Sequence, residues 1–256
     1  MPQTPRPAEA TQFDAAAADQ MEKIISDLGR MYYERNEALQ EVARAHHEAL
    51  FRLALAAEYK DDDTGVHIVR IGFLAEALAL HLGQSRAYAT LLRKAAPMHD
   101  IGKIGIPDNV LKKPGPLNHA EREIMNQHPA IGADILGKSR IALFQMASEI
   151  ALAHHERWDG CGYPSGLSGE NIPLSGRIVT VADFYDALTM DRVYRKAFSE
   201  EKALAMLGNE RGHAFDPQVV DCFIDNHTAL MALRQQVTAK RMTFADLVNE
   251  TAPLAC

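Results

Sequence analysis

The residues with the clearest potential for chemistry are histidines and aspartates at separated points of the chain. The 256-residue sequence contains 11 histidines, several of which form, with two aspartates, a set of nitrogen and oxygen donors. The set consists of His67, His99, Asp100, His128, His154, His155 and Asp183. Imidazole and carboxylate together suit iron, manganese or zinc. The pattern therefore indicates a metal site without sulfur ligands.

Each of these residues also has an ordinary structural explanation when it is taken alone. A His-Asp pair can cap a helix end, and single histidines such as His67 and His128 are often core or surface residues. Asp183 lies in the apolar segment RIVTVADFYDAL, where a partner arginine or a buried cap would also satisfy its carboxylate. Two adjacent imidazoles, as in His154-His155, are costly if both are protonated, which favours a neutral, metal-bound state.

The complete set is stronger evidence than any of its members. Helical bundles build metal sites from side chains on facing helices. The seven donors are too many for one tetrahedral ion, and two metals can share a bridging aspartate. We therefore expect a centre of two divalent ions, with iron or manganese as the first choices.

The segments that carry these residues have helical periodicity. Helices are expected over residues 66–82, 86–98, 119–137, 141–155 and 175–188. Ser199 and Asp216-Pro217 are typical starts of two further helices. Alternating strand patterns are absent, and the helices are separated by two Gly/Pro-rich loops, which are usually functional when they are long. The sequence predicts an all-α fold.

The N-terminal region differs from the rest of the chain. Residues 1–12 contain three prolines and are predicted to be a disordered lead-in, whereas residues 13–58 are predicted to form one long helix. Its seam positions alternate four and three apart, which is the heptad pattern of a coiled coil. The seam comprises Met21, Ile25, Leu28, Tyr32, Arg35, Leu39, Val42, His46, Ala49 and Leu53. Either the helix lies on its own domain, or it forms a parallel coiled coil; we favour the homodimer.

Composition limits the expected partners. Lys+Arg 27 against Asp+Glu 34 gives a net charge of −7, which excludes a general nucleic-acid binder and hence a DNA partner. Cys161, Cys222 and Cys256 show no CxxC spacing, so neither a disulfide framework nor a thiolate zinc site is indicated. No signal peptide or membrane-spanning apolar run is recognisable. We expect a cytoplasmic protein with no membrane partner.

Four strings of this sequence resemble the HD-GYP domain, a branch of the HD phosphohydrolase superfamily. They are HDIGKIGIPDNVLKKPGPLN (99–118), NQHPAIGADIL (126–136), HHERWDGCGYPSGL (154–167) and DFYDALTMDRVYR (183–195). The name of the branch matches His99-Asp100 and Gly162-Tyr163-Pro164. We expect an HD-type helical bundle over residues 59–232, followed by a C-terminal helical tail over residues 233–256.

The resemblance implies a metal-dependent phosphodiesterase that hydrolyses cyclic di-GMP, a bacterial second messenger, to pGpG, and it leaves open whether hydrolysis continues to GMP. It implies that the seven donors are the metal ligands, that Asp100 bridges two ions, and that Asp100 and Lys103 are the catalytic residues. The implied substrate contacts are Lys103, Tyr163, Arg192 and Arg195, and to these we add Asp186 as a candidate substrate contact. For Asp186, a position behind the ligands and a salt bridge to Arg192 stay open as alternatives.

One position departs from the family pattern. Members with a third metal carry Glu four residues before the first histidine, and the residue at this position is Asp63. Aspartate is one methylene shorter than glutamate, so it would reach a third ion poorly or only through water. The third metal is therefore left open.

Three classes of function remain after this comparison. Hydrolysis of cyclic di-GMP is favoured, and a phosphodiesterase for another cyclic dinucleotide, such as cyclic GMP-AMP, is the related alternative. The GYP loop argues against a general HD nucleotide phosphohydrolase. The third class is a weakly catalytic effector that binds nucleotide or a diguanylate cyclase, and the presence of every core ligand argues against it. An upstream sensor or receiver protein is a further expected partner.

Overall fold

The computed structural model describes residues 7–60, 65–191, 196–240 and 242–248. Within these ranges every named element is a helix, and the only β-type pairing is an isolated bridge between Arg211 and Phe215. The all-α prediction is confirmed. The chain divides into two compact units, residues 1–46 and residues 47–256. None of the helices described combines the length and the apolar character needed to cross a membrane.

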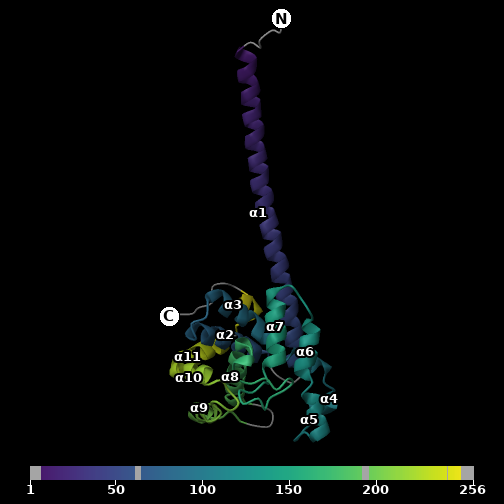
Figure 1. Ribbon diagram of the computed structural model, residues 1–256, viewed down its shortest axis with the longest axis vertical. Helices are drawn as coiled ribbons and strands as arrows, with labels where there is room; N and C mark the ends of the chain where they lie inside the picture. Colours follow the sequence, from purple (N-terminus) through teal and green to yellow (C-terminus); the bar gives the residue numbers. More distant parts are fainter. Residues whose placement is uncertain (1–6, 61–64, 192–195, 241, 249–256) are drawn as a thin grey trace. The chain divides into compact units, whose positions relative to one another are not determined.

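The long N-terminal helix is present as predicted. Helix α1 (Pro7–Lys60) is continuous over 54 residues and is drawn in purple and blue in Figure 1. Residues 7–12 are helical, so their prediction as part of a disordered lead-in is wrong. Pro7 is compatible with this start, because a proline in the first turn removes an N–H that has no partner within the helix. Residues 1–6 lie outside the described ranges.

The part of α1 in the first unit exposes the apolar side chains of the predicted seam. Ile25 is 64% exposed, Leu28 59%, Leu39 58% and Val42 52%. Apolar side chains at heptad spacing normally lie against a partner helix. No described residue of the first unit covers these four side chains, since the rest of that unit is the same helix.

The second unit begins inside α1. Leu50, Phe51, Ala54 and Ala57 are each at most 7% exposed, and three of them recur at the spacing of one helix face. The predicted domain boundary between residues 58 and 59 is therefore wrong, because the last turns of α1 are part of the core of the second unit. Apolar residues at helical spacing run through both units, so the pattern alone does not reveal where the core begins.

The second unit is built around α2 (Val66–His81), in which every residue from His67 to Ala79 is buried. A helix that is apolar on nearly all sides must be enclosed, and α2 packs against α3 (Arg86–Ala95), α8 (Leu174–Leu188) and α11 (His227–Ala239). The other elements are η1 (Ala96–Met98), η2 (Ile101–Gly105), α4 (Asp108–Leu111), α5 (His119–Met125), α6 (His128–Leu136), α7 (Ala142–Ala153), η3 (Gly169–Asn171), α9 (Glu200–Asn209), α10 (Pro217–Asp225) and α12 (Phe244–Val248).

The C-terminal helices belong to the same core. Leu230, Leu233 and Val237 of α11 and Leu247 of α12 are each at most 8% exposed. The predicted boundary between residues 232 and 233 falls inside α11 and is therefore wrong, although α11 and α12 confirm that the described residues beyond it are largely helical. The amphipathic pattern of α11 predicted a helix, but it could not show that its apolar face completes the packing around α2.

The helix expected over residues 119–137 is two helices. The chain leaves the helical path at Asn126 and Gln127, between α5 and α6. Pro129 lies in the first turn of α6, where proline is favoured, whereas it would disrupt the interior of a longer helix. This break places His128 at the start of a helix, where its side chain can reach neighbouring segments.

Candidate metal centre

The seven predicted donors come together, and most of them lie at helix ends. They are His67 in the first turn of α2, His99 and Asp100 between η1 and η2, His128 at the start of α6, His154 and His155 directly after α7, and Asp183 within α8. Adjacent residues inside an α-helix point about 100° apart, because one turn takes 3.6 residues. At a helix end the backbone leaves this path, so neighbouring side chains can converge on one point.

A close backbone contact between η2 and α6 positions Asp100 and His128. A Cβ on Gly102 would lie 1.9 Å from the carbonyl oxygen of His128 and 2.5 Å from the amide nitrogen of Gly132. Only glycine permits backbones to approach this closely. The glycine in the string HDIG therefore has a structural role, which is to hold the HD pair against the start of α6.

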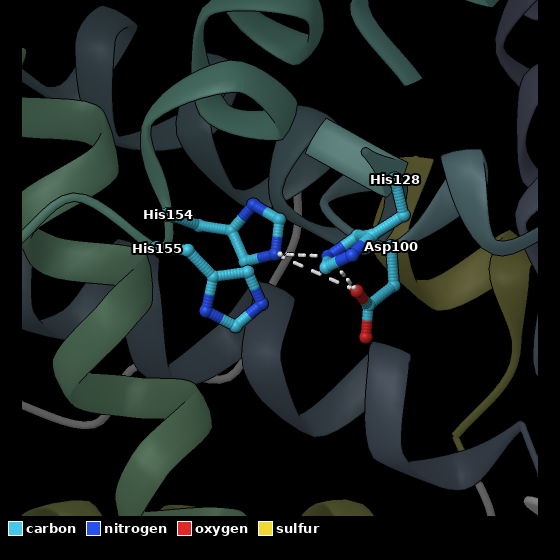
Figure 2. A group of neighbouring side chains, drawn as sticks. All are labelled: Asp100, His128, His154 and His155. Carbon is cyan, nitrogen blue, oxygen red and sulfur yellow. Dashed lines mark hydrogen bonds and ion pairs between the residues drawn. The ribbon is translucent and has the colours of Figure 1, made fainter. Parts of the chain in front are cut away.

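We call the first cluster, Asp100, His128, His154 and His155, the His128 group (Figure 2). One donor atom from each residue lies within 4.8 Å of the others. Asp100 Oδ1 is 3.2 Å from His128 Nε2 and 3.5 Å from His154 Nε2. The ring of His155 packs against those of His154 and His128, with centroids 4.2 and 4.9 Å apart. Four donors thus surround one point.

We call the second cluster, His67, His99 and Asp183, the His67 group. Its donor atoms also lie within 4.8 Å of one another. Asp183 Oδ1 is 3.1 Å from His67 Nε2 and 3.9 Å from His99 Nε2. His99 Nε2 is in turn 3.3 Å from Asp100 Oδ2. Asp100 therefore presents one carboxylate oxygen to each group, as a bridging ligand would.

Backbone carbonyls set the orientation of three of these imidazoles. Nδ1–H donates to the carbonyl of Ala96 in His99 (3.0 Å), of Met125 in His128 (2.8 Å) and of Ala151 in His154 (2.9 Å). This hydrogen bond assigns the proton of the neutral ring to Nδ1. The Nε2 lone pairs of all three rings are thereby left facing Asp100, which is the arrangement that a ligating histidine needs.

A buried ionic network orients His67. Its Nδ1–H donates to Asp186 at 2.7 Å, and the same carboxylate accepts from Arg70 Nε at 2.8 Å and from Arg234 Nε at 2.6 Å. The Asp186 side chain has 0% exposure, so its predicted contact with substrate is wrong and its alternative position, behind the ligands, is the one observed. Arg70 could have been inferred, since it lies one turn after His67, but no sequence pattern pointed to Arg234.

The carboxylates of the centre are ionised at neutral pH. Burial raises the pKa of Asp100, but the Lys103 ammonium and His99 outweigh burial and hold that pKa well below its usual range. Burial also raises the pKa of Asp183, and the hydrogen bond from His67 outweighs it and lowers that pKa. Ionised carboxylates are the form that binds metal.

The histidines of the His67 group have raised pKa values. Burial lowers the pKa of His67, but hydrogen bonds to Asp183 and Asp186 outweigh burial and bring it well above its usual range. Burial likewise lowers the pKa of His99, but the negative charge of Asp100 outweighs burial, so the pKa of His99 is raised. A metal that binds this group must displace protons, because only neutral imidazole is a ligand.

Two histidines of the His128 group are shifted in the opposite direction. Burial lowers the pKa of His154, and it lowers the pKa of His155 well below its usual range. The neighbouring imidazoles add to the effect at His155, because a second positive charge nearby is unfavourable. These rings are neutral at physiological pH and are ready to bind a metal.

Unsatisfied buried atoms support the fit of this site to metal ions. His99 Nε2 and Asp100 Oδ1 are buried and have no hydrogen-bond partner among the described residues. An unsatisfied buried polar atom costs about 1–3 kcal/mol, and a bound cation would satisfy both. The donors are nitrogen and oxygen atoms only, which suits iron, manganese or zinc. The residues present therefore fit the metal centre that the sequence predicts.

The predicted cationic residues have different outcomes. Lys103 lies beside the centre, with its Nζ 2.8 Å from Asp100 Oδ2 and its side chain 19% exposed. Arg192 and Arg195, the other predicted phosphate contacts, lie outside the described residues. Asp63, considered for a third metal, also lies outside them.

The last turn of α1 contributes two residues that were not predicted. Glu58 is 4% exposed, and burial raises its pKa. The nearby His67 lowers that pKa by less, so the net shift is upward. Lys60 Nζ donates to the carbonyls of Ile104 at 2.8 Å and Ile106 at 2.6 Å, just after the HD pair. The signal for Glu58 was available, since an acidic residue on the apolar face of a helix is the same feature that drew attention to Asp183.

A cavity of about 650 Å³ opens beside the metal centre, within the size range of small-molecule sites. His155 and Asp183 line it, and so does Tyr163. The Tyr163 ring stacks on His155, with centroids 4.8 Å apart and an angle of 20° between planes. Tyr163 thus contacts a predicted ligand and also lines the cavity.

The loop that carries Tyr163 is tied back onto the residues after α7. A Cβ on Gly162 would lie 2.4 Å from the amide nitrogen of Arg157, so the first residue of the GYP string must be glycine. The buried carboxylate of Glu156 accepts hydrogen bonds from the amides of Ser165 at 2.7 Å and Leu167 at 2.9 Å. These contacts fix the loop as one wall of the cavity.

Sequence comparison identifies relatives of this chain. A cyclic di-GMP phosphodiesterase of Vibrio cholerae is 47% identical over 202 residues, covering 73% of this chain and 41% of that protein. The cyclic di-GMP phosphodiesterase response regulator RpfG of Xanthomonas campestris pv. campestris is 45% identical over 193 residues, covering 75% and 51%. The 3'3'-cGAMP-specific phosphodiesterase 2 of Vibrio cholerae is 37% identical over 202 residues, covering 79% and 39%. The chain thus spans about half, or less, of the length of these curated relatives.

Structural comparison and a family model agree with these relatives. The crystal structure of a cyclic GMP-AMP specific phosphodiesterase of V. cholerae matches with a TM-score of 0.58 at 20% identity, covering 80% of this chain and 54% of that one, which shows a shared fold. The model of the HD domain family matches residues 20–219. The chain therefore belongs to the HD domain family, as its HD and GYP motifs predicted.

Proposed function

We propose that this chain is a metal-dependent phosphodiesterase that hydrolyses cyclic di-GMP. The observation that carries the proposal is the position of Asp100, with one oxygen toward the His67 group and the other toward the His128 group. Two ions that share a carboxylate in this way can stabilise the attacking and leaving oxygens of a phosphodiester. Two of the relatives bear this activity in their names, which supports the same substrate.

Cyclic GMP-AMP is the second candidate substrate. It is favoured by one observation, the 37% identity to a 3'3'-cGAMP-specific phosphodiesterase. Identity to the cyclic di-GMP enzymes is higher, at 47% and 45%, and we therefore place cyclic di-GMP first.

We further propose two divalent ions, iron or manganese, as the cofactor. The His67 group would hold one ion and the His128 group the other, with Asp100 contacting both. When bound, such ions would polarise the phosphoryl oxygens and lower the pKa of a bound water toward neutrality. A third ion through Asp63 remains part of the proposal, since that residue precedes His67 by four positions.

The remaining residues would act on the substrate through charge and position. Lys103 would offset the negative charge that develops on the phosphate, as Arg192 and Arg195 would. Tyr163 would bound the nucleotide on the side of His155. Local cations of this kind allow a chain of net charge −7 to bind an anionic substrate.

Product analysis on the purified full chain tests this proposal. The protein is loaded with iron without oxygen, or with manganese, and incubated with cyclic di-GMP. We expect pGpG to form first and GMP to follow, with two ions bound per chain. Absence of any linear product with either metal would overturn the proposed function, and faster hydrolysis of cyclic GMP-AMP would favour the second candidate.

We also propose that the chain forms a homodimer through α1, in the cytoplasm, where a diguanylate cyclase or an upstream sensor or receiver protein could act on it. The exposed apolar residues of the heptad seam support this interface, because Leu28 and Leu39 are 59% and 58% exposed.

A pair of matched substitutions tests the dimer. Leu28 lies on the seam and Met31 lies off it, with exposures of 59% and 61%. By light scattering we expect a dimer for the parent chain and for Met31→Asp, and a monomer for Leu28→Asp. A parent chain that is monomeric at micromolar concentration would overturn the interface.

A further inference from the structure

The cavity beside the metal centre extends well beyond the metal-binding residues. Besides His155 and Asp183, its lining includes Phe184, Phe215 and Glu210, the last of which directly follows α9. A phosphodiester that lies at the metal ions would therefore place an attached base in the outer part of the cavity. The residues of this outer part have no role in the chemistry described above.

The outer part pairs an acceptor with a donor. Arg157 Nη2 is 3.7 Å from a Glu210 carboxylate oxygen, and the two side chains are 38% and 43% exposed. Arg157 is itself held by Asp159, through hydrogen bonds of 3.1 Å from Nε and 2.7 Å from Nη2. Arg157 is thus fixed by a second carboxylate, which leaves Glu210 available to a ligand.

Two aromatic rings form an aromatic wall in the lining of the same cavity. The rings of Phe184 and Phe215 have centroids 4.8 Å apart and planes inclined at 54°. Phe184 follows Asp183 in α8, and Phe215 is 6% exposed. Aromatic surfaces bind the flat faces of nucleobases by stacking, whichever base is present. The wall would hold a base, and the polar pair in the same lining would select which one.

We infer that Glu210, assisted by Arg157, is a guanine-reading subsite, an inference that rests on the proposed function for the class of substrate. Guanine presents O6 as an acceptor beside two donors, N1–H and N2–H₂. A carboxylate accepts from both donors, and a neighbouring guanidinium donates to O6. Adenine presents the reverse order, with an unprotonated N1 beside an amino donor, so the carboxylate would face a lone pair. The same subsite therefore rejects adenine.

Nucleotide binding tests the subsite separately from catalysis. The probes are GMP and AMP, titrated calorimetrically into the metal-loaded full chain. A carboxylate that pairs with two donors of one base discriminates by about 1–3 kcal/mol, which is about 5- to 150-fold in affinity. We expect the parent chain to prefer GMP within that range and Glu210→Gln to lose the preference. Equal binding of GMP and AMP by the parent chain would overturn the inference, whatever its turnover.

A control in α9, the helix that directly precedes Glu210, separates the subsite from a general loss of charge. Glu201→Gln removes the same charge in the first turn of α9, from an exposed residue that does not line the cavity. This variant should keep the GMP preference. Metal content and melting temperature should match the parent chain in both variants. A Glu210→Gln protein that is intact by these criteria and still prefers GMP would also overturn the inference.

Cyclic GMP-AMP provides a test of orientation. It has two different phosphodiester bonds, and a chain that anchors its guanine in one place aligns only one bond with the metals. We expect one linear dinucleotide from the parent chain and both from Glu210→Gln. Comparable amounts of both from the parent chain would contradict the subsite. A parent chain that prefers GMP but cleaves no cyclic dinucleotide would overturn the proposed function alone.

Discussion

The two groups of the metal centre use similar donors but are supported by different means. Behind His67 lies a network of side chains, in which Asp186 binds His67, Arg70 and Arg234, whereas His99 of the same group donates to a backbone carbonyl. Behind the His128 group lie backbone carbonyls, which accept from His128 and His154, and the stacked ring of Tyr163. A single substitution can remove support built from side chains but not support built from backbone. The two groups should therefore differ in their response to mutation and to pH.

Asp100 is the residue for which this difference should disappear, because it faces both groups. In Asp100→Ala we expect both ions to be lost and turnover to fall by about three orders of magnitude or more, since each 1.36 kcal/mol of lost transition-state stabilisation is a factor of ten. Elemental analysis and a product assay measure both effects. Two tightly bound ions and normal turnover in this variant would exclude the shared carboxylate.

Asp186→Asn should separate the two groups. The substitution weakens the orientation of His67 and leaves Arg70 and Arg234 partly buried without their anion. Loss of such a supporting carboxylate typically lowers metal affinity by about 10- to 100-fold. We expect this loss for one of the two ions only, as measured by metal titration of the chelator-treated protein. Equal weakening of both ions would mean that the groups share their support.

Asp216 provides the matched control for Asp186→Asn. It is also buried, with a side chain 1% exposed and an ion pair to Arg177 at 2.5 Å, but it lies at the start of α10 and has no contact with the predicted ligands. Breaking a buried pair of this kind costs about 3–5 kcal/mol of unfolding free energy. Asp216→Asn should lower the melting temperature and leave both ions bound. If Asp216→Asn also lost metal, the metal loss in Asp186→Asn would be explained by general destabilisation of the fold.

The pH dependence of metal binding should also differ between the groups. The raised pKa values of His67 and His99 mean that metal competes with protons there, whereas burial has already lowered those of His154 and His155. Between about pH 6 and 8, the affinity of the His128 group for its ion should change little. The affinity of the His67 group should rise by up to about tenfold per pH unit for each proton displaced. Titrations at several pH values measure both, and parallel curves would contradict this difference.

The same shifted pKa values predict how the stability of the chelator-treated protein depends on pH. A raised pKa at His67 contributes stability that is complete below the unfolded-state value of about 6.5 and is lost as pH rises through the higher folded-state value. The lowered pKa of Asp186 contributes stability above about 3.9, which is lost as pH falls through the folded-state value. Without metal, the melting temperature should therefore be highest between about pH 3.9 and 6.5, and it should decrease at both lower and higher pH.

The sequence was sufficient to predict the seven metal donors, because their residue types and positions are unusual in themselves. Paired histidines at helix ends and an aspartate in an apolar helix are unusual enough to stand out, and the structure brings all seven together. The support behind them was less predictable. Asp186 and Arg234 are 48 residues apart on different helices, and no local pattern links an arginine of α11 to an aspartate of α8.

Domain boundaries were the weaker part of the sequence prediction for a similar reason. A helix that changes from exposed to core-packed along its length keeps the same periodicity, as α1 does between Val42 and Leu50. The burial of Leu230, Leu233 and Val237 in α11 depends on the surface of α2, which is distant in sequence. Tertiary packing decides both boundaries, and local periodicity does not contain it.

The smallest effect should come from Tyr163, whose ring stacks on His155 of the His128 group. Aromatic stacking of the kind seen with His155 contributes about 0.5–1.5 kcal/mol, so Tyr163→Ala should weaken the ion of that group by about 2- to 13-fold. Tyr163→Phe keeps the ring and should change affinity by less than about twofold. Burial raises the pKa of the Tyr163 hydroxyl to about 12, so the phenol is neutral at neutral pH. Removing the hydroxyl in Tyr163→Phe therefore changes no charge near the ion. Metal titration of the two variants measures the difference. Equal losses would assign the effect to the hydroxyl, and no loss in Tyr163→Ala would mean that the backbone carbonyls alone hold His128 and His154 in place.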